Sequence, residues 1–267
     1  MNEVLLDKIR KLSAAEEKYN VAREFLQELI LQIMDRSGYS SYLAFVGGTA
    51  LRILYDLPRF SEDLDFCLIN NKGFKFDKLL ATIKKELELN GFEIEISKGR
   101  DRTILSEFIK FKGLLYEIGI AGQKGEKLFI KLEIDSNPPS GYKTEIQLVN
   151  KDFLFKVQSY DLPSLFASKL HAFLFRKYAK GRDYYDLLWF LSKRIPVNYK
   201  LLSAAASQTE KKALRIDAGQ LKKMLIDKVG KADFPHVSRD VAVFLHKKEE
   251  REYFKKEYFL AAIKKGI

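Results

Sequence analysis

The stretch from Phe45 to Phe66 contains the residues best suited to chemistry. It opens with an apolar run, 43–46, that leads into Gly47-Gly48-Thr49, and it closes with Asp63-Leu64-Asp65. Side chains alternate along a strand, so Asp63 and Asp65 would project from one face. Paired carboxylates bind hard divalent cations, and a glycine turn before a helix offers backbone N–H groups to phosphate. The stretch therefore predicts a site for Mg²⁺ and a nucleoside triphosphate, and the alternative is a solvated acidic strand beside a turn.

A second set of candidate residues lies in the run 127–135. Leu132 and Ile134 alternate there with Lys131, Glu133 and Asp135, which predicts a strand with one apolar face. A third carboxylate on a neighbouring strand could act as general base or help to hold a catalytic metal. The alternative is a half-exposed strand with no chemical role.

A third set lies in the helical part of the chain. Lys169 falls on the apolar stripe of a helix expected at 164–176 and so breaks the pattern of that stripe, as functional residues often do. A lysine that reaches from the edge of the stripe to solvent is the alternative. Further on, Asp183 and Asp186 follow Gly181-Arg182, and capping of the next helix would by itself explain both acids.

These residues resemble a known family. Gly47-Gly48-Thr49-Ala50-Leu51-Arg52, followed by Arg59-x-Ser61-x-Asp63-Leu64-Asp65-Phe66, is similar to the AbiEii/AbiGii nucleotidyltransferases, which belong to the DNA polymerase β-like superfamily. Those proteins are toxins of bacterial abortive-infection and toxin–antitoxin systems. The resemblance continues in K-x-x-A at Lys169 and in R-D-x-x-D-L from Arg182 to Leu187.

The resemblance implies a role for each matching residue. Asp63, Asp65 and Glu133 would hold the metal, and Glu133, with Asp135 as the alternative, would activate the acceptor. Phosphates would be bound by Gly47, Gly48, Thr49, Arg52, Ser61 and Lys169. Asp183 is the first choice for an essential acid that supports Lys169 and Arg182, and Asp186 remains open.

The implied reaction transfers a nucleoside monophosphate from an NTP to RNA, with tRNA as the expected acceptor and release of pyrophosphate. A cognate antitoxin would be the protein partner. Two other functions stay open. One is a nucleotidyltransferase acting on a small molecule, of the aminoglycoside type, and the other is a non-catalytic RNA-binding protein on the same fold.

The elements that must position these residues form an α+β pattern. A helical arm is expected at 2–37 and a helix at 76–89. Strands are expected at 43–46, 61–69, 92–97, 103–116, 128–135, 145–149 and 153–157. Helices at 197–207, 217–230, 237–248 and 250–265 would follow the one at 164–176. We therefore expect a nucleotidyltransferase core with a small mixed sheet at 1–160 and a helical domain at 161–267, with the substrate between them.

Charge divides the chain at about the same place. The net charge is +11, but residues 1–150 hold 22 Lys/Arg against 23 Asp/Glu, whereas residues 151–267 hold 25 against 13. This asymmetry favours an acidic partner, such as RNA, for the second part, and a lysine-rich solvated surface is the alternative. A single cysteine, three histidines and no long apolar run predict a cytoplasmic protein without a zinc site.

Overall fold

The chain forms two compact units in the computed structural model, which describes residues 3–98, 104–245 and 247–267. The first, here called the sheet unit, comprises 1–55, 61–137 and 145–159. The second, the helical unit, comprises 56–60, 138–144 and 160–267. The short segment 56–60 therefore belongs to the helical unit, although the chain on either side of it belongs to the sheet unit.

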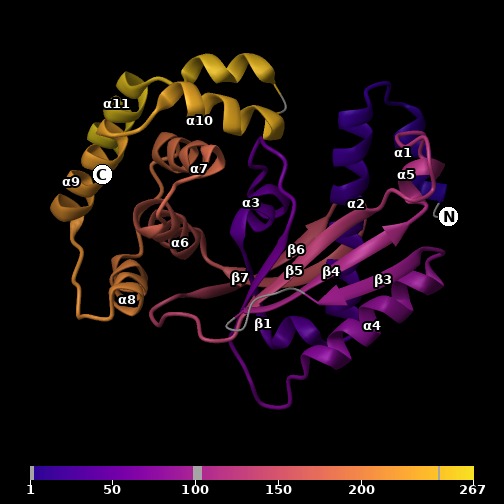
Figure 1. Cartoon of the computed structure of the whole chain (residues 1–267). Coiled ribbons are helices and arrows are strands. Elements are labelled where there is room, and N and C mark those ends of the chain that lie inside the picture. Colours follow the sequence, from indigo (N-terminus) through magenta and orange to yellow (C-terminus); the bar gives the residue numbers. More distant parts are fainter. Residues whose placement is uncertain (1–2, 99–103, 246) are drawn as a thin grey trace. The chain divides into compact units, whose positions relative to one another are not determined.

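A seven-stranded mixed sheet forms the centre of the sheet unit (Figure 1). Its order is β3-β4-β5-β2-β1-β7-β6. The pairs β2–β5 and β1–β7 are parallel, and the pairs β1–β2, β3–β4 and β4–β5 are antiparallel. The strands are β1 (Leu43–Val46), β2 (Leu64–Leu68), β3 (Glu93–Lys98), β4 (Ile104–Lys112), β5 (Leu128–Asp135), β6 (Thr144–Asn150) and β7 (Leu154–Tyr160). The mixed sheet and the later helices confirm the predicted α+β fold.

The helices of the sheet unit are α1 (Glu3–Arg10), α2 (Ala15–Arg36), α3 (Gly47–Tyr55), α4 (Phe76–Leu89) and α5 (Leu114–Glu117), with a short 3₁₀ helix, η1 (Tyr39–Ser41). The prediction of one helical arm at 2–37 is wrong, because residues 11–14 separate α1 from α2. Two shorter helices therefore occupy the region where one was expected. Helix α2 packs on α4 and β5, and α4 packs on β3.

The expected strand at 103–116 is shorter in the structure. Strand β4 ends at Lys112, since Gly113 has a φ of 69° and begins helix α5. A left-handed backbone is easiest for glycine and interrupts the regular pleat. The first residue of the expected strand, Thr103, lies outside the described residues.

The helical unit contains α6 (Leu162–Phe175), α7 (Gly181–Ser192), α8 (Tyr199–Glu210), α9 (Ala218–Gly230), α10 (Phe234–Val241) and α11 (Lys256–Gly266), with 3₁₀ helices η2 (Ala242–Phe244) and η3 (Lys248–Tyr253). Asp161 caps the start of α6, because it accepts a hydrogen bond from Ser164 N–H at 3.0 Å. The helix expected at 237–248 is wrong, since α10 ends at Val241. The helix expected at 250–265 is divided into η3 and α11.

One face of the sheet is apolar and packs in the core, which leaves the opposite face for polar side chains. Leu64 and Phe66 of β2 belong to the buried core with Leu132 and Ile134 of β5. The alternation of side chains then places Asp65 and Glu133 on the opposite face. Across the part of the chain that the structure describes, none of the helices has the length and apolar character needed to cross a membrane.

Candidate active site

Gly47 allows the turn that opens the site. It follows β1, starts α3 and has a φ of 82°, in the left-handed region that favours glycine. Asp65 lies directly against it: a Cβ built on Gly47 would come within 2.8 Å of the Asp65 Cγ. Glycine is therefore required here for two reasons, the backbone angle and the close approach of the carboxylate. The first turn of α3 also presents backbone N–H groups that the helix itself leaves unused.

The segment that carries Asp63 is held by helix α2 and by Thr49. Gln27 Nε2 donates to the carbonyls of Ser61 at 3.1 Å and Glu62 at 2.9 Å. Arg23 Nη1 reaches the Glu62 carboxylate at 3.0 Å. The Thr49 hydroxyl is fully buried and donates to the Asp63 carbonyl. Thr49 thus fixes the backbone beside the acid, and its hydroxyl is already engaged.

Strand register brings the third carboxylate into place. Asp65 of β2 is the parallel partner of Glu133 on β5, whereas Asp135 lies opposite Cys67, which is two residues further along. The Asp135 carboxylate also accepts a hydrogen bond from Asn137 N–H at 2.9 Å. The two alternatives from the sequence therefore have different surroundings, and Glu133 is the one in register with Asp65.

A lysine lies among these acids. Lys131 Nζ donates to Glu133 Oε1 at 2.6 Å and stands 5.9 Å from the centre of the Phe108 ring. Burial lowers the pKa of Lys131, but the hydrogen bond and charge of Glu133 outweigh that effect and raise it above its ordinary value. The charges of Asp63 and Asp65 raise the pKa further. Glu133 thus contacts Lys131 directly, and the negative charges of Asp63 and Asp65 act on the same ammonium.

The chemistry of these groups suits a hard divalent ion. All three acids offer oxygen ligands, the kind that Mg²⁺ prefers. Ser106, the strand partner of Glu133 on β4, has a buried hydroxyl with no hydrogen-bond partner among the described residues. Within those same residues, no three His, Cys, Asp or Glu side chains already stand in a metal-holding arrangement. The fit is thus one of donor type and charge, with the Lys131 ammonium occupying the position where positive charge is needed.

Two predicted phosphate-binding residues have other contacts. Arg52 Nε forms an ion pair with Glu24 Oε2 at 2.7 Å, which ties α3 to α2. Ser61 is half-buried, and its carbonyl accepts from Gln27. The Ser61 contact helps to hold the segment that carries Asp63, whereas the Arg52 contact joins two helices. Their predicted roles toward phosphate stay predictions.

The helical unit contains a second charged cluster around Asp186. Arg59 binds this buried carboxylate with both Nε, at 2.7 Å to Oδ1, and Nη2, at 2.8 Å to Oδ2. Lys169 Nζ lies 2.9 Å from Oδ2. Burial raises the pKa of Asp186, but the two cations outweigh it and hold the pKa at about 2. The acid is therefore ionised under all ordinary conditions.

Asp183, the first choice from the sequence, has a capping role in the structure. Its Oδ2 accepts from Lys180 N–H at 2.9 Å at the start of α7. Arg176 Nη1 approaches the same carboxylate at 3.4 Å. The acid that contacts Lys169 is instead Asp186, one helical turn further on. The sequence left these two acids open, because three residues' spacing places both on one side of a helix.

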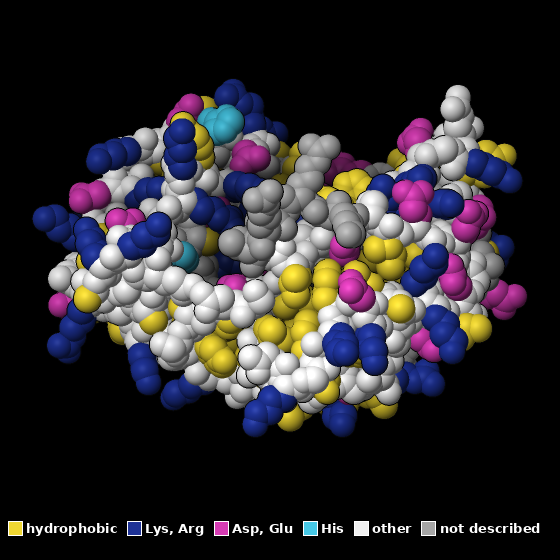
Figure 2. All heavy atoms as spheres, turned by 60° about the horizontal axis from the view of Figure 1, so that its bottom comes forward, with side chains coloured by type: hydrophobic (Ala, Val, Ile, Leu, Met, Phe, Trp, Pro, Cys, Tyr) yellow, Lys and Arg dark blue, Asp and Glu magenta, His cyan; other side chains and the backbone are white. Residues whose placement is uncertain are grey.

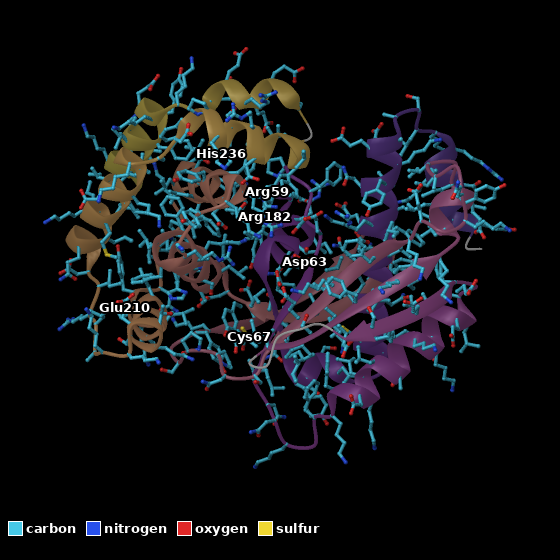
Figure 3. All side chains as sticks on the ribbon, viewed as in Figure 1. Arg59, Asp63, Cys67, Arg182, Glu210 and His236 are labelled. Atoms are coloured by element: carbon cyan, nitrogen blue, oxygen red, sulfur yellow. The ribbon has the colours of Figure 1, made fainter. Side chains whose placement is uncertain are left out.

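Arg59 is the residue that sequence reasoning missed. Its side chain is 1% exposed, and its Nη1 donates to the Phe60 carbonyl at 2.8 Å. A bridge to Leu245 fixes its backbone. Arg182 lies close by, with its guanidinium 5.5 Å from the Phe244 ring centre (Figure 3). Arg59 could have been noticed because it begins the motif that runs to Phe66, but no role was assigned to it from the sequence.

One comparison with known proteins identifies the family of the chain. The sequence model of the family described as "Nucleotidyl transferase AbiEii toxin, Type IV TA system" matches residues 29–258. A search of curated proteins gave no match.

Two solved structures from Helicobacter pylori share the fold. One is described as a proposed nucleotidyltransferase. It is 20% identical, covers 92% of this chain and 96% of its own, and has a TM-score of 0.55. The other, JHP933, is 19% identical, with coverage of 92% and 93% and a TM-score of 0.54.

Proposed function

Since the chain belongs to the AbiEii family of nucleotidyl transferase toxins of type IV toxin–antitoxin systems, we propose that it transfers a nucleoside monophosphate from an NTP to RNA. Family membership implies an NTP substrate and a cognate antitoxin. The proposal adds three points: Mg²⁺ as the metal, tRNA as the acceptor, and abortive infection as the setting, with the cytoplasm as the place of action.

The observation that carries this proposal is the convergence of acids beside the glycine turn. Asp65 packs against Gly47, Glu133 stands in register with Asp65, and Lys131 is drawn to all of these charges. Like charges on one sheet face destabilise it unless something positive lies between them. A sheet maintained purely for stability would not need this concentration of charge next to an open helix N-terminus.

In the proposed reaction, Asp63 and Asp65 hold Mg²⁺, with Glu133 beside them. Bound there, the ion would polarise the phosphoryl oxygens and neutralise charge that develops in the displacement. The N–H groups of Gly48 and Thr49 bind phosphate oxygens at the start of α3, with Ser61 and Arg52 as further candidates. Glu133 accepts the proton of the acceptor hydroxyl, and the hydrogen bond from Lys131 Nζ at 2.6 Å holds its carboxylate in place.

We also propose roles for residues of the helical unit. Lys169 would neutralise charge on the triphosphate, and the Asp186 carboxylate would orient its ammonium from 2.9 Å away. Arg59 donates to both oxygens of that carboxylate, so Asp186 can orient Lys169 without an excess of buried negative charge. Asp183 acts indirectly, because it caps α7, the helix that carries Asp186.

An RNA acceptor is proposed because of the charge distribution. Residues 151–267 carry nearly twice as many Lys and Arg residues as acids. On the face drawn in Figure 2, Lys and Arg side chains stand at many separate points over the surface. Dispersed cations suit a long polyanion, which contacts several of them at once, better than a small molecule.

The test is a transfer assay with each α-labelled NTP in turn, with and without total RNA. The proposal predicts label in RNA, dependent on Mg²⁺, for at least one NTP, together with release of pyrophosphate. Label that enters only small molecules would favour a small-molecule transferase. No labelled product with any NTP, from a protein that is folded by circular dichroism, would contradict the proposed activity.

A further inference from the structure

The helical unit has a pocket of about 280 Å³ that the motif residues do not explain. It lies between α7 and the segment that includes η3, and it is lined by Tyr185, Leu188, Trp189, Ser192, Glu250, Tyr253 and Phe254. Small-molecule sites usually measure about 300–1,000 Å³, so this pocket suits one compact ring system rather than a whole NTP. None of the lining residues belongs to the Lys169–Asp186–Arg59 cluster.

The lining is aromatic on several sides. The rings of Tyr185 and Phe254 are nearly parallel, with centroids 6.2 Å apart. Trp189 is 9% exposed, whereas Tyr253 is 60% exposed and stands at the rim. Aromatic side chains that are left accessible in this way form stacking surfaces for planar rings. Tyr253 packs edge-on against Tyr258, with ring centroids 6.1 Å apart, and still leaves more than half of its surface exposed beside the pocket.

One carboxylate in the pocket lining can accept a hydrogen bond from a ligand. Tyr185 Oη donates to Glu250 Oε2 at 3.0 Å and also lies 3.1 Å from the Pro58 carbonyl. An ionised carboxylate offers about four lone-pair positions, so Glu250 can accept further hydrogen bonds from a ligand. A ligand that fits must therefore combine a flat ring with an N–H donor at its edge.

The charges around the pocket favour a ligand that carries phosphates. Lys193 Nζ already stands 5.3 Å from the Trp189 ring centre. The segment 247–256 has five Lys/Arg against three Glu, and Arg194 follows Lys193. This excess of positive charge near the pocket attracts a ring that is attached to phosphates.

We propose that this pocket receives one unpaired nucleobase that carries an exocyclic amino group, supplied by the RNA acceptor, an assignment that rests on the proposed function. The base stacks against Trp189 and Tyr253, its amino group donates to Glu250, and nearby lysine and arginine side chains contact the flanking phosphates. Unpaired RNA bases are commonly read in this way, by stacking and by hydrogen bonds at the base edge. Adenine, cytosine and guanine have such an amino group, whereas the N–H at the pairing edge of uracil lies between two carbonyl oxygens, which a carboxylate repels.

The chain provides its own probe, because Trp189 is the only tryptophan. Titration of the full-length protein with short oligo(rC), oligo(rA) and oligo(rU), followed by tryptophan fluorescence, should show quenching by the first two at concentrations about tenfold lower than by oligo(rU). Tyr253→Ala should weaken oligo(rC) binding about tenfold, the range found when a stacking residue is removed. Glu250→Gln should keep the stacking but remove most of the preference for oligo(rC) over oligo(rU).

Tyr116→Ala is the matched control. Tyr116 is an exposed tyrosine like Tyr253, but it lies in the sheet unit, where Lys124 stands over its ring. The substitution should leave binding unchanged. Equal quenching by all three oligonucleotides, or unaltered binding in Tyr253→Ala, would overturn the proposal. Quenching by free CTP or ATP as strong as by the oligonucleotides would overturn the assignment to RNA.

The transfer assay separates this inference from the proposed function. Base-selective quenching without any transfer would leave the pocket standing and remove the proposed activity. Transfer to RNA without quenching would support the proposed activity and contradict the assignment of the pocket to a base of RNA.

Discussion

At the scale of single residues, the sequence predicts the acids better than their partners. Asp63 and Asp65 could be recognised because their spacing matches the period of a strand. The partner of Lys169 could not, because Asp183 and Asp186 share one side of α7. What distinguishes them is Arg59, which is 127 residues from Asp186 in the chain. A contact over such a separation depends on the tertiary fold and leaves no local pattern.

Gly47→Ala tests the close approach at the turn. The new Cβ would enter the space of the Asp65 carboxylate. The alanine would also have to keep a φ of 82°, which side chains other than glycine rarely adopt. We expect the free energy of unfolding to fall by about 2–4 kcal/mol, measured by urea denaturation, with loss of transfer activity. Gly38→Ala is the control, since Gly38 has a φ of 77° but nothing within 4 Å. It should lose only about 1 kcal/mol, and an equal loss in both variants would show that the contact with Asp65 is unimportant.

Lys131→Met tests whether this ammonium stands in for a metal ion. Without it, the three acids repel one another, so the melting temperature in EDTA should fall by a few degrees. Added Mg²⁺ or Mn²⁺ should then stabilise the variant more than the wild type, since a ligand that binds only the native state raises its stability. Lys127→Met is the control, because Lys127 pairs with Glu95 at 2.6 Å instead. Equal metal-induced shifts in wild type and Lys131→Met would count against the site.

At the scale of elements, apolar periodicity gave the sheet and most helices, and it failed at their ends. The break between α1 and α2 falls at 11–14, where no glycine or proline marks it. The end of β4 depends on the left-handed backbone of Gly113. The register that pairs Asp65 with Glu133 could not be predicted either, because both Glu133 and Asp135 fit the alternation of β5. Register is set by pairing across the sheet.

Asp186→Asn tests the cluster that joins α6, α7 and the 56–60 segment. Arg59 and Lys169 would lose their shared counter-charge, and removal of one member of a buried ion pair costs about 3–5 kcal/mol. Lys169→Met should cost less, because Arg59 still balances Asp186. Asp183→Asn should cost about 1 kcal/mol, the usual effect of a weakened cap. Urea denaturation of the three variants should therefore rank them in that order, and the reverse order would contradict the assigned contacts.

The same carboxylate predicts a pH dependence. The pKa of Asp186 is about 2 in the folded protein against 3.8 for an ordinary aspartate. Its stabilising effect is therefore complete above about pH 4 and is lost as the pH falls toward 2. The stability difference between wild type and Asp186→Asn should shrink over that interval. A difference that stays constant from pH 5 to pH 2 would show that the ionised form is not what stabilises the unit.

At the scale of the whole molecule, the sequence shows the charge asymmetry directly but does not show how the chain divides into two units. The segment 56–60 belongs to the helical unit although sheet-unit residues flank it, and no change in composition marks it. The predicted boundary between residues 160 and 161 stays a prediction. The charge asymmetry itself has a measurable consequence for RNA binding.

RNA affinity should fall steeply as salt rises, because bound lysines displace condensed counterions. Lys255, Lys264 and Lys265 are exposed, so changing all three to Glu should weaken binding to every RNA sequence alike. The slope of log affinity against log salt should become shallower by about 2, at roughly 0.7–0.9 for each phosphate contact. Lys256 is left unchanged, because its Nζ donates to the Gly230 carbonyl at 3.1 Å. An unchanged slope would place the RNA site elsewhere.

The most direct test of the central claim is the rate of NMP transfer by Asp65→Asn at several Mg²⁺ concentrations. This variant keeps the shape of the side chain next to Gly47 but removes the charge that would hold the metal. Asp77→Asn, an exposed aspartate in the first turn of α4, is the matched control. We predict that Asp65→Asn transfers at least about 10³-fold more slowly than wild type while melting within a few degrees of it. The control should transfer at the wild-type rate. Undiminished transfer by folded Asp65→Asn would contradict the claim that Asp65 of β2, with Asp63 just before that strand, carries the reaction.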